Sequence, residues 1–157
     1  MLESSISLSS MTKEDAHKLF IDFKNDKALF EREDDYKEYK YNSDEVDNYV
    51  SRQMNKGYIL LSIIYNDDVI GEIRFKGIRD SSSEIGIILK NDKYKNHGIG
   101  SIAIKKALDY ARNNLKLNKI YASILKTNKR SLHVFESLGF EYNDEDNHFI
   151  RLYKLID

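Results

Sequence analysis

Residues 83–115, SEIGIILKNDKYKNHGIGSIAIKKALDYARNNL, decide the fold of this chain. The stretch opens with an apolar, β-branched run at 85–89 that has the length and composition of a strand. A polar loop at 90–97 follows, and Gly98-Ile99-Gly100-Ser101 leads into a run whose apolar residues recur at helical spacing. A strand, a glycine-bearing loop and a helix in this order place backbone N–H groups at a positive helix N-terminus. The stretch therefore predicts a phosphate site.

Several kinds of phosphate loop share this order of elements, and spacing separates them. A P-loop requires GxxxxGK[ST], a string that does not occur in the chain. A Rossmann fingerprint requires GxGxxG, of which Gly98-Ile99-Gly100 with Ala103 in third position is a tolerated variant. The loop at 90–97 is too long for the tight turn of a Rossmann unit, however, and the preceding chain has the pattern of a meander without βαβ repeats.

Two segments together resemble the GNAT superfamily of N-acetyltransferases. The first, Lys95-Asn96-His97-Gly98-Ile99-Gly100, is similar to the family's pyrophosphate-binding pattern Q/R-x-x-G-x-G/A, with lysine at the first position. The second, NKRSLHVFESLGF at 128–140, is similar to the family's N-x-x-[SA]-x-x-[LV]-[YF]-E-x-[LM]-G-F segment. A generic phosphate-binding α/β domain would require the second segment to be a coincidence. Both segments look closest to the ribosomal-protein N-terminal and spermidine acetyltransferase branch.

The resemblance implies an α/β (α+β) fold in one domain, residues 1–157, with the element order βααβββαβαββ. It also implies a mixed central sheet in which one pair of strands splays apart. Periodicity favours strands at 6–9, 58–65, 69–75, 84–89, 119–125, 140–142 and 149–155. It favours helices that begin after Thr12 and at Ser43, a helix up to residue 115 and a helix at 130–138 that ends at Gly139.

The composition limits the classes of function. The 157 residues include 25 basic and 26 acidic side chains, a net charge of −1 that argues against a general nucleic-acid binder. The absence of cysteine excludes disulfides and thiolate chemistry, and the 4 histidines have no metal-ligand spacing. No apolar run approaches the ~20 residues of a membrane helix, and no export signal is visible. We expect a cytoplasmic protein without a metal, nucleic-acid or membrane partner.

The resemblance implies acetyl-CoA as the cofactor. The loop and the start of the following helix would hold the pyrophosphate, and the edge of the preceding strand would pair with the pantetheine chain. Asn128 would contact the cofactor and also cap the helix that follows it. The predicted cofactor-binding residues are Ile88, Leu89, Lys90, Lys95, Asn96, His97, Gly98, Ile99, Gly100, Ser101 and Asn128.

The predicted general base is Glu84, because some family members carry a glutamate on this strand that deprotonates the amine. A carboxylate at the mouth of a half-buried cleft is expected to have a pKa raised toward neutrality, as a base requires. Glu72 on the preceding strand is the reserve candidate. Many family members protonate the departing thiolate with a tyrosine, but Phe135 stands at that place here. The tyrosines that could substitute are Tyr94, Tyr121 and Tyr142.

These features predict an acetyl-CoA-dependent N-acetyltransferase that acetylates a primary amine by direct attack in a ternary complex. The acceptor would be a small molecule or a protein N-terminus, and a homodimer is compatible with this function. An acidic cluster would attract a polycation, although a solvated charged face is the simpler interpretation. The cluster comprises Glu31, Glu33, Asp34, Asp35 and Glu38. The alternative, which the phenylalanine at position 135 favours, is a non-catalytic acyl-CoA-binding or sensing module of the same fold.

Overall fold

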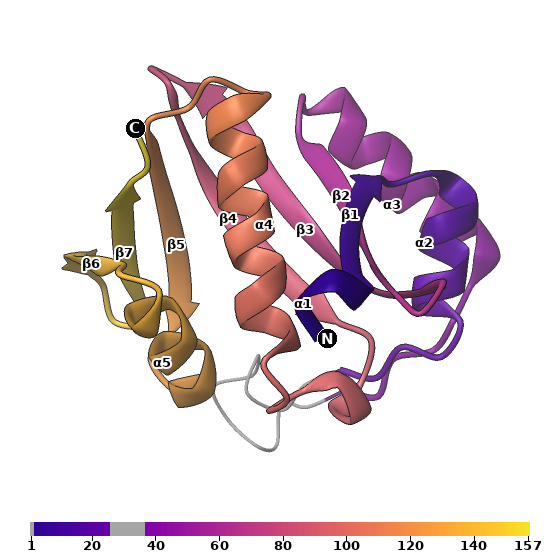
Figure 1. Cartoon of the computed structure of the whole chain (residues 1–157). Coiled ribbons are helices and arrows are strands. Elements are labelled where there is room, and N and C mark those ends of the chain that lie inside the picture. The colour runs from indigo at the N-terminus through magenta and orange to yellow at the C-terminus, as the bar shows by residue number, and fades with distance from the viewer. Residues whose placement is uncertain (1, 26–36) are drawn as a thin grey trace.

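The computed structural model describes residues 2–25 and 37–157, which form a seven-stranded sheet with helices on both faces (Figure 1). The strands are β1 Ile6–Ser10, β2 Ile59–Tyr65, β3 Asp68–Arg79, β4 Ser82–Leu89, β5 Lys119–Leu125, β6 Glu141–Glu145 and β7 Phe149–Leu155. The helices are α1 Leu2–Ser5, α2 Lys13–Phe20, α3 Ser43–Asn55, α4 Ile99–Asn113, α5 Lys129–Ser137 and the 3₁₀ helix η3 Asp92–Tyr94.

The sheet is mixed, as the sequence predicted. Its strand order is β1-β2-β3-β4-β5-β7-β6, and every neighbouring pair is antiparallel except β4 and β5, which run parallel. The predicted order of elements along the chain is confirmed, with α1 and η3 as additions. Both additions are about one turn long, which is too short for hydrophobic periodicity to mark them in the sequence.

Strands β4 and β5 separate after a short parallel pairing. Their register runs from Ser82 opposite Lys119 to Glu84 opposite Tyr121 and stops there. Beyond this point β4 continues to its end beside β3, and β5 continues to its end beside β7. The two strands therefore diverge toward their carboxyl ends, which confirms the predicted splayed pair.

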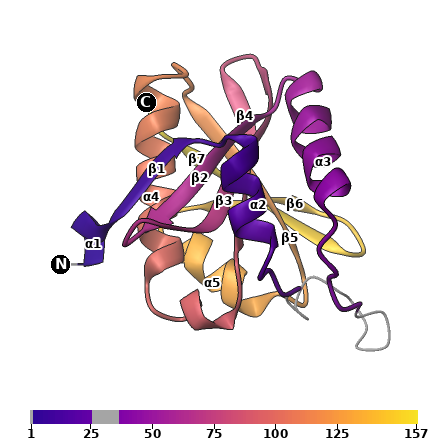
Figure 2. The ribbon, with the colours of Figure 1, turned by 90° about the vertical axis from the view of Figure 1, so that its right-hand side faces the viewer.

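Two hydrophobic cores occupy opposite faces of the sheet. Figure 1 shows α4 in front of the central strands, and Figure 2, turned by 90°, shows α2 and α3 on the other side. The larger core packs α4 and α5 against the sheet around residues such as Phe75 and Ile104. The smaller core packs α2 and α3 against the opposite face around Leu19 and Val50. Because side chains alternate along a strand, β4 contributes to both cores.

Local capping and turn chemistry explain where several elements begin and end. The Thr12 hydroxyl accepts a hydrogen bond from the Asp15 N–H at 3.0 Å, and the Asp15 carboxylate accepts one from the Thr12 N–H at 3.2 Å. This reciprocal capping box begins α2. Asn66 and Asp67, with φ of 50° and 68°, form the two-residue turn between β2 and β3. Gly139, with φ of 93°, ends α5 in the predicted left-handed conformation.

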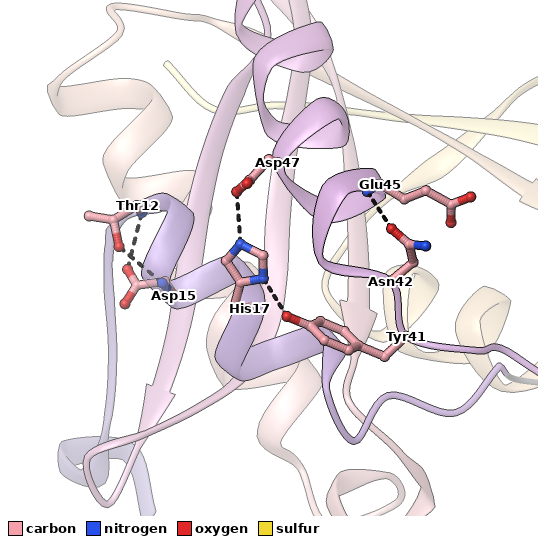
Figure 3. Close-up of polar contacts among 7 residues, drawn as sticks. All are labelled: Thr12, Asp15, His17, Tyr41, Asn42, Glu45 and Asp47. Carbon is pink, nitrogen blue, oxygen red and sulfur yellow. Dashed lines mark hydrogen bonds and ion pairs between the residues drawn. The ribbon is translucent and has the colours of Figure 1, made fainter.

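His17 joins the two helices of the smaller core. Its Nδ1 lies 2.7 Å from the Tyr41 hydroxyl, and its Nε2 lies 2.7 Å from Oδ1 of Asp47 on α3 (Figure 3). Asn42 accepts a hydrogen bond from the Glu45 N–H and so caps α3 beside this bridge (Figure 3). Helices α2 and α3 and residues 41–42 are thereby tied together over one face of the sheet.

Over residues 2–25 and 37–157, no helix is long and apolar enough to cross a membrane. Within the same ranges, no three His, Cys, Asp or Glu side chains come together as metal ligands.

Candidate active site

A pocket of about 150 Å³ lies at the open end of the β4–β5 pair. It is bounded by the carboxyl end of β4 and by the first turns of α4 and α5. The first turns of these two helices lie in the lower part of Figure 1. Its wall consists of Phe23, Lys24, Ile87, Ile88, Leu89, Tyr94, Lys95, Asn96, Gly98, Gly100, Ser101, Ile104, Asn128, Arg130, Ser131, Val134 and Phe135. The charged side chains in this wall are all basic, which suits an anionic ligand.

The first turn of α4 offers backbone donors to this pocket. Gly98 occupies the N-cap position with φ of 80°, and no side chain caps the helix there. The first N–H groups of an α-helix have no acceptor within the helix, so those after Gly98 can bind an anion. Gly100 and Ser101 line the pocket directly. The start of α4 therefore presents backbone donors to the pocket, and the phosphate cradle at this place stays a prediction.

The loop before α4 contributes unequally to the pocket. Lys95 is 8% exposed and lines the wall, with its Nζ 3.2 Å from Asp92 Oδ1. Asn96 also lines the wall and has a positive φ of 62°. His97 is exposed and lies outside the wall, and the Ile99 side chain is buried in the larger core. Neither of these two predicted residues lines the pocket.

Two of the three residues predicted to bind the cofactor at the edge of β4 line the pocket. Ile88 and Leu89 line the pocket on the side from which β5 has diverged. Lys90 differs from the expectation of a free strand edge, because its N–H donates to the Ile70 carbonyl at 2.7 Å and its carbonyl accepts from the Lys24 N–H at 2.9 Å. The bond to Ile70 continues the antiparallel β3–β4 register by one residue beyond the pair of Gly71 and Leu89.

Helix α5 closes the far side of the pocket. Asn128 is 8% exposed, lines the wall and accepts a hydrogen bond from the Ser131 N–H at 3.2 Å, so it caps the helix as predicted. Phe135 is buried at the pocket wall and packs edge to face against Phe140 with ring centroids 5.0 Å apart. Of the three candidate substitute tyrosines, Tyr94 is the one whose side chain belongs to the wall.

Glu84 lies at the paired end of β4, away from the pocket. The nearest residue of β4 in the pocket wall is Ile87, three positions along the strand, which at strand geometry is a distance of about 10 Å. Its Oε1 accepts from the Ser123 hydroxyl at 2.6 Å, and its Oε2 lies 2.9 Å from the Lys76 Nζ. Burial raises the pKa of Glu84, but these two partners and Arg151 outweigh burial and hold the pKa below its ordinary value. The expectation of a raised pKa was therefore wrong for Glu84.

Glu72, the reserve candidate, has the environment expected of Glu84. It is 3% exposed, and the Tyr49 hydroxyl lies 2.9 Å and 2.8 Å from its two carboxylate oxygens. Burial raises the pKa of Glu72 and outweighs the hydrogen bond from Tyr49 and the nearby Arg74, both of which lower it. Its cross-strand neighbour on β4 is Ile88, which lines the pocket.

Several residues of the pocket were not predicted. Phe23 and Lys24 follow α2, far from the two recognised segments, and only the tertiary structure brings them to the wall. Arg130 could have been predicted from the sequence, because it is a basic residue in the first turn of a helix beside a predicted phosphate site. Most of the acidic cluster proposed to attract a polycation lies outside the described residues, which include only its member Glu38.

Residues 6–141 match the family model described as the acetyltransferase (GNAT) domain, and the chain belongs to this family. The two segments identified in the sequence supply the start of α4 and the whole of α5, on either side of the pocket.

Two bacterial proteins illustrate the similarity in sequence. Acetyltransferase PseH of Campylobacter jejuni is 31% identical over 98 residues, which are 62% of this chain and 59% of that protein. Spermidine N(1)-acetyltransferase of Escherichia coli is 33% identical over 61 residues, which are 39% of this chain and 33% of that protein. The chain thus matches less than two thirds of the length of these relatives.

Solved structures share the fold over nearly the whole chain. Spermidine N-acetyltransferase from Vibrio cholerae, in complex with CoA and spermine, has a TM-score of 0.74 at 19% identity and covers 98% of this chain and 96% of its own. Campylobacter jejuni PseH has a TM-score of 0.72 at 21% identity and covers 98% and 99%.

Proposed function

We propose that the protein is an acetyl-CoA-dependent N-acetyltransferase that acetylates a primary amine by direct attack in a ternary complex. The observation that carries this proposal is the pocket at the diverging end of β4, where an uncapped helix start meets basic side chains. A cofactor with a pyrophosphate and an extended thiol arm requires such a cradle at one end and an open strand edge at the other.

Different residues of the pocket are suited to hold different parts of the cofactor. The backbone after Gly98, together with Lys95 and Arg130, is suited to hold the pyrophosphate. The diverging edge at Ile88 and Leu89 is suited to pair with the pantetheine chain. Bound acetyl-CoA supplies an acyl group that a neutral amine can attack. The chain's own contribution to the step is orientation and the removal of a proton from the amine.

The acceptor would meet the acetyl group on the face of the sheet covered by α2 and α3. The named similarities to spermidine N-acetyltransferases support a small amine as the acceptor. We therefore propose a small primary amine as the acceptor class and a cytoplasmic location for the reaction.

The pocket assignment is tested at Gly100, because its φ is not left-handed and a Cβ there has room, with Ile87 Cδ1 at 4.0 Å as its nearest neighbour. A leucine at this position would project into the cavity, so Gly100→Leu should weaken acetyl-CoA binding at least tenfold, about 1.4 kcal/mol. Isothermal calorimetry with acetyl-CoA measures this effect, and Gly100→Ala is the matched control that should bind almost normally. Equal affinity of the leucine variant and the wild type would place the cofactor elsewhere.

Turnover is measured as release of free thiol from acetyl-CoA with polyamines, aminoglycosides, amino acids and short peptides. Thiol release with one amine class would support the enzyme and define its acceptor. Tight binding of acetyl-CoA without thiol release would favour the acyl-CoA-sensing alternative, which the phenylalanine at position 135 also favours.

A further inference from the structure

We propose that Tyr49 takes the proton from the acceptor ammonium and passes its own proton to the buried carboxylate of Glu72. This inference rests on the proposed function. It assigns the proton transfer to a pair of residues on α3 and β3, in place of Glu84 on β4.

The geometry of the pair is that of a proton relay. The Tyr49 hydroxyl lies 2.9 Å from Oε1 and 2.8 Å from Oε2 of Glu72, so its proton is shared between the two oxygens of one carboxylate. Glu72 is 3% exposed, whereas Tyr49 is only partly buried. A tyrosine hydroxyl can accept a hydrogen bond while it donates another, which is what a relay between an amine and the carboxylate requires.

The pair lies beside the pocket. Glu72 stands directly opposite Ile88 in the β3–β4 register, and paired residues of antiparallel strands have Cα atoms about 4.5–5.5 Å apart. Ile88 lines the pocket. Ile88 and Tyr49 both pack against the smaller core. Phe20 also connects the two places, because its ring centroid lies 5.4 Å from that of Phe23 in the pocket wall and 5.6 Å from that of Tyr49.

Charged groups around the pair suit a carboxylate that must gain a proton and release it. Arg74, two residues along β3, faces Glu72 and Tyr49 and favours their ionised forms. Its guanidinium extends over β4 at Gly86, where an added Cβ would lie 3.8 Å from Nη2. On the other side, Asp15 of α2 accepts from the Ser62 hydroxyl, and Ser62 is the cross-strand neighbour of Glu72. Asp15 thus accepts from Ser62 and from the Thr12 N–H, whereas the Tyr49 hydroxyl donates to Glu72.

The transfer balances without a further reactant. One N–H bond of the acceptor ammonium breaks as its proton moves to the Tyr49 oxygen, and the O–H proton of Tyr49 moves to a carboxylate oxygen of Glu72. The products are a neutral amine, a neutral tyrosine and a neutral carboxylic acid. The amine is then the nucleophile, and Glu72 returns its proton through Tyr49 to the departing thiolate or to solvent. Tyr49 is never left as an anion, in keeping with the burial and the Glu72 charge that raise its pKa.

The test is the pH profile of kcat/KM for Tyr49→Phe, measured by thiol release with the amine that the wild type acetylates best. Removing a general base lowers the rate by about 10²-fold or more near neutral pH. The deficit should shrink as pH rises toward the amine pKa of about 10, because the solution then supplies the free amine. Tyr142→Phe is the matched control, because that hydroxyl also bonds a glutamate, Glu145 at 3.0 Å, on the exposed strand β6.

Glu72→Gln keeps the volume of the side chain and a hydrogen-bond acceptor for Tyr49, and it should show the same loss and the same recovery at high pH. If the two residues form one relay, the double variant should be no slower than the slower single variant. Calorimetric binding of acetyl-CoA confirms that each variant is folded.

The outcomes separate this inference from the proposed function. If the wild type releases thiol and binds acetyl-CoA but Tyr49→Phe keeps the rate and pH profile of the wild type, the relay is overturned. The proposed N-acetyltransferase function is then retained. A uniform loss at every pH would also overturn the relay, since it indicates a structural role. If the wild type releases no thiol with any amine, the proposed function is overturned and the relay with it.

Discussion

At the scale of the single residue, Gly71 on β3 shows how closely the strands beside the site approach. A Cβ at this position would lie 2.5 Å from the Ile88 carbonyl oxygen, 2.9 Å from Ile63 Cδ1 and 3.0 Å from Leu89 Cδ2. The first of these atoms is backbone and cannot swing aside. Gly71→Ala should therefore push β4 away from β3 and lower the free energy of unfolding by about 1–3 kcal/mol, the range for overpacked cores. Urea denaturation followed by circular dichroism measures this change.

Gly77, on the same strand, is the control for this substitution. A Cβ there would have no neighbour within 4 Å, and its backbone is not left-handed. Gly77→Ala should change the free energy of unfolding by no more than about 0.5 kcal/mol. Similar losses for the two variants would show that glycine is required for a reason other than the close approach of β4.

At the scale of the element, α2 depends on its first turn. The helix is only 8 residues long, so its own hydrogen bonds stabilise it weakly, and the Thr12–Asp15 capping box supplies partners for two otherwise free N–H groups. Thr12→Ala should lower the free energy of unfolding by about 1 kcal/mol. Thermal unfolding measures the loss, and Thr12→Ser, which keeps the hydroxyl, should recover most of it. An equal loss in the serine variant would mean that the threonine methyl matters more than the cap.

At the scale of the whole molecule, two glutamates give the stability opposite dependences on pH. The raised pKa of Glu72 means that its favourable contribution is complete below the unfolded-state pKa of about 4.3 and is lost as pH rises through the folded-state value. The lowered pKa of Glu84 means that its contribution is present above about pH 4.3 and is lost as pH falls through the folded-state value.

Glu72→Gln should accordingly raise the melting temperature by a few degrees at neutral pH, because it removes a buried charge and keeps an acceptor for Tyr49. The gain should fade in acid, where the wild-type carboxyl is itself neutral. Glu84→Gln should behave in the opposite way, with a loss at neutral pH that fades in acid. Differential scanning calorimetry of both variants across this pH range measures the two trends, and the same trend in both would contradict the assigned directions.

The sequence by itself determined the order of the elements, and the resemblance of its two motifs to a family predicted the splayed pair and most of the residues that line the pocket. These features depend on short-range patterns: alternation in the strands, helical spacing after Gly98, and two compact motifs whose residues stay together when the chain folds. Lys95, Gly100 and Asn128 belong to these motifs, so their meeting at one pocket could be predicted from the sequence.

Only the tertiary structure decided that the pKa of Glu72 is raised and that of Glu84 is lowered. A pKa depends on burial and on charged neighbours, and these come from elements that are distant in sequence. Glu84 meets Ser123 of β5 and Lys76 of β3 and is held ionised, while Glu72 is enclosed beneath Tyr49 of α3. No periodicity along the chain records such encounters, because side chains are brought together by the pairing and packing of whole strands and helices.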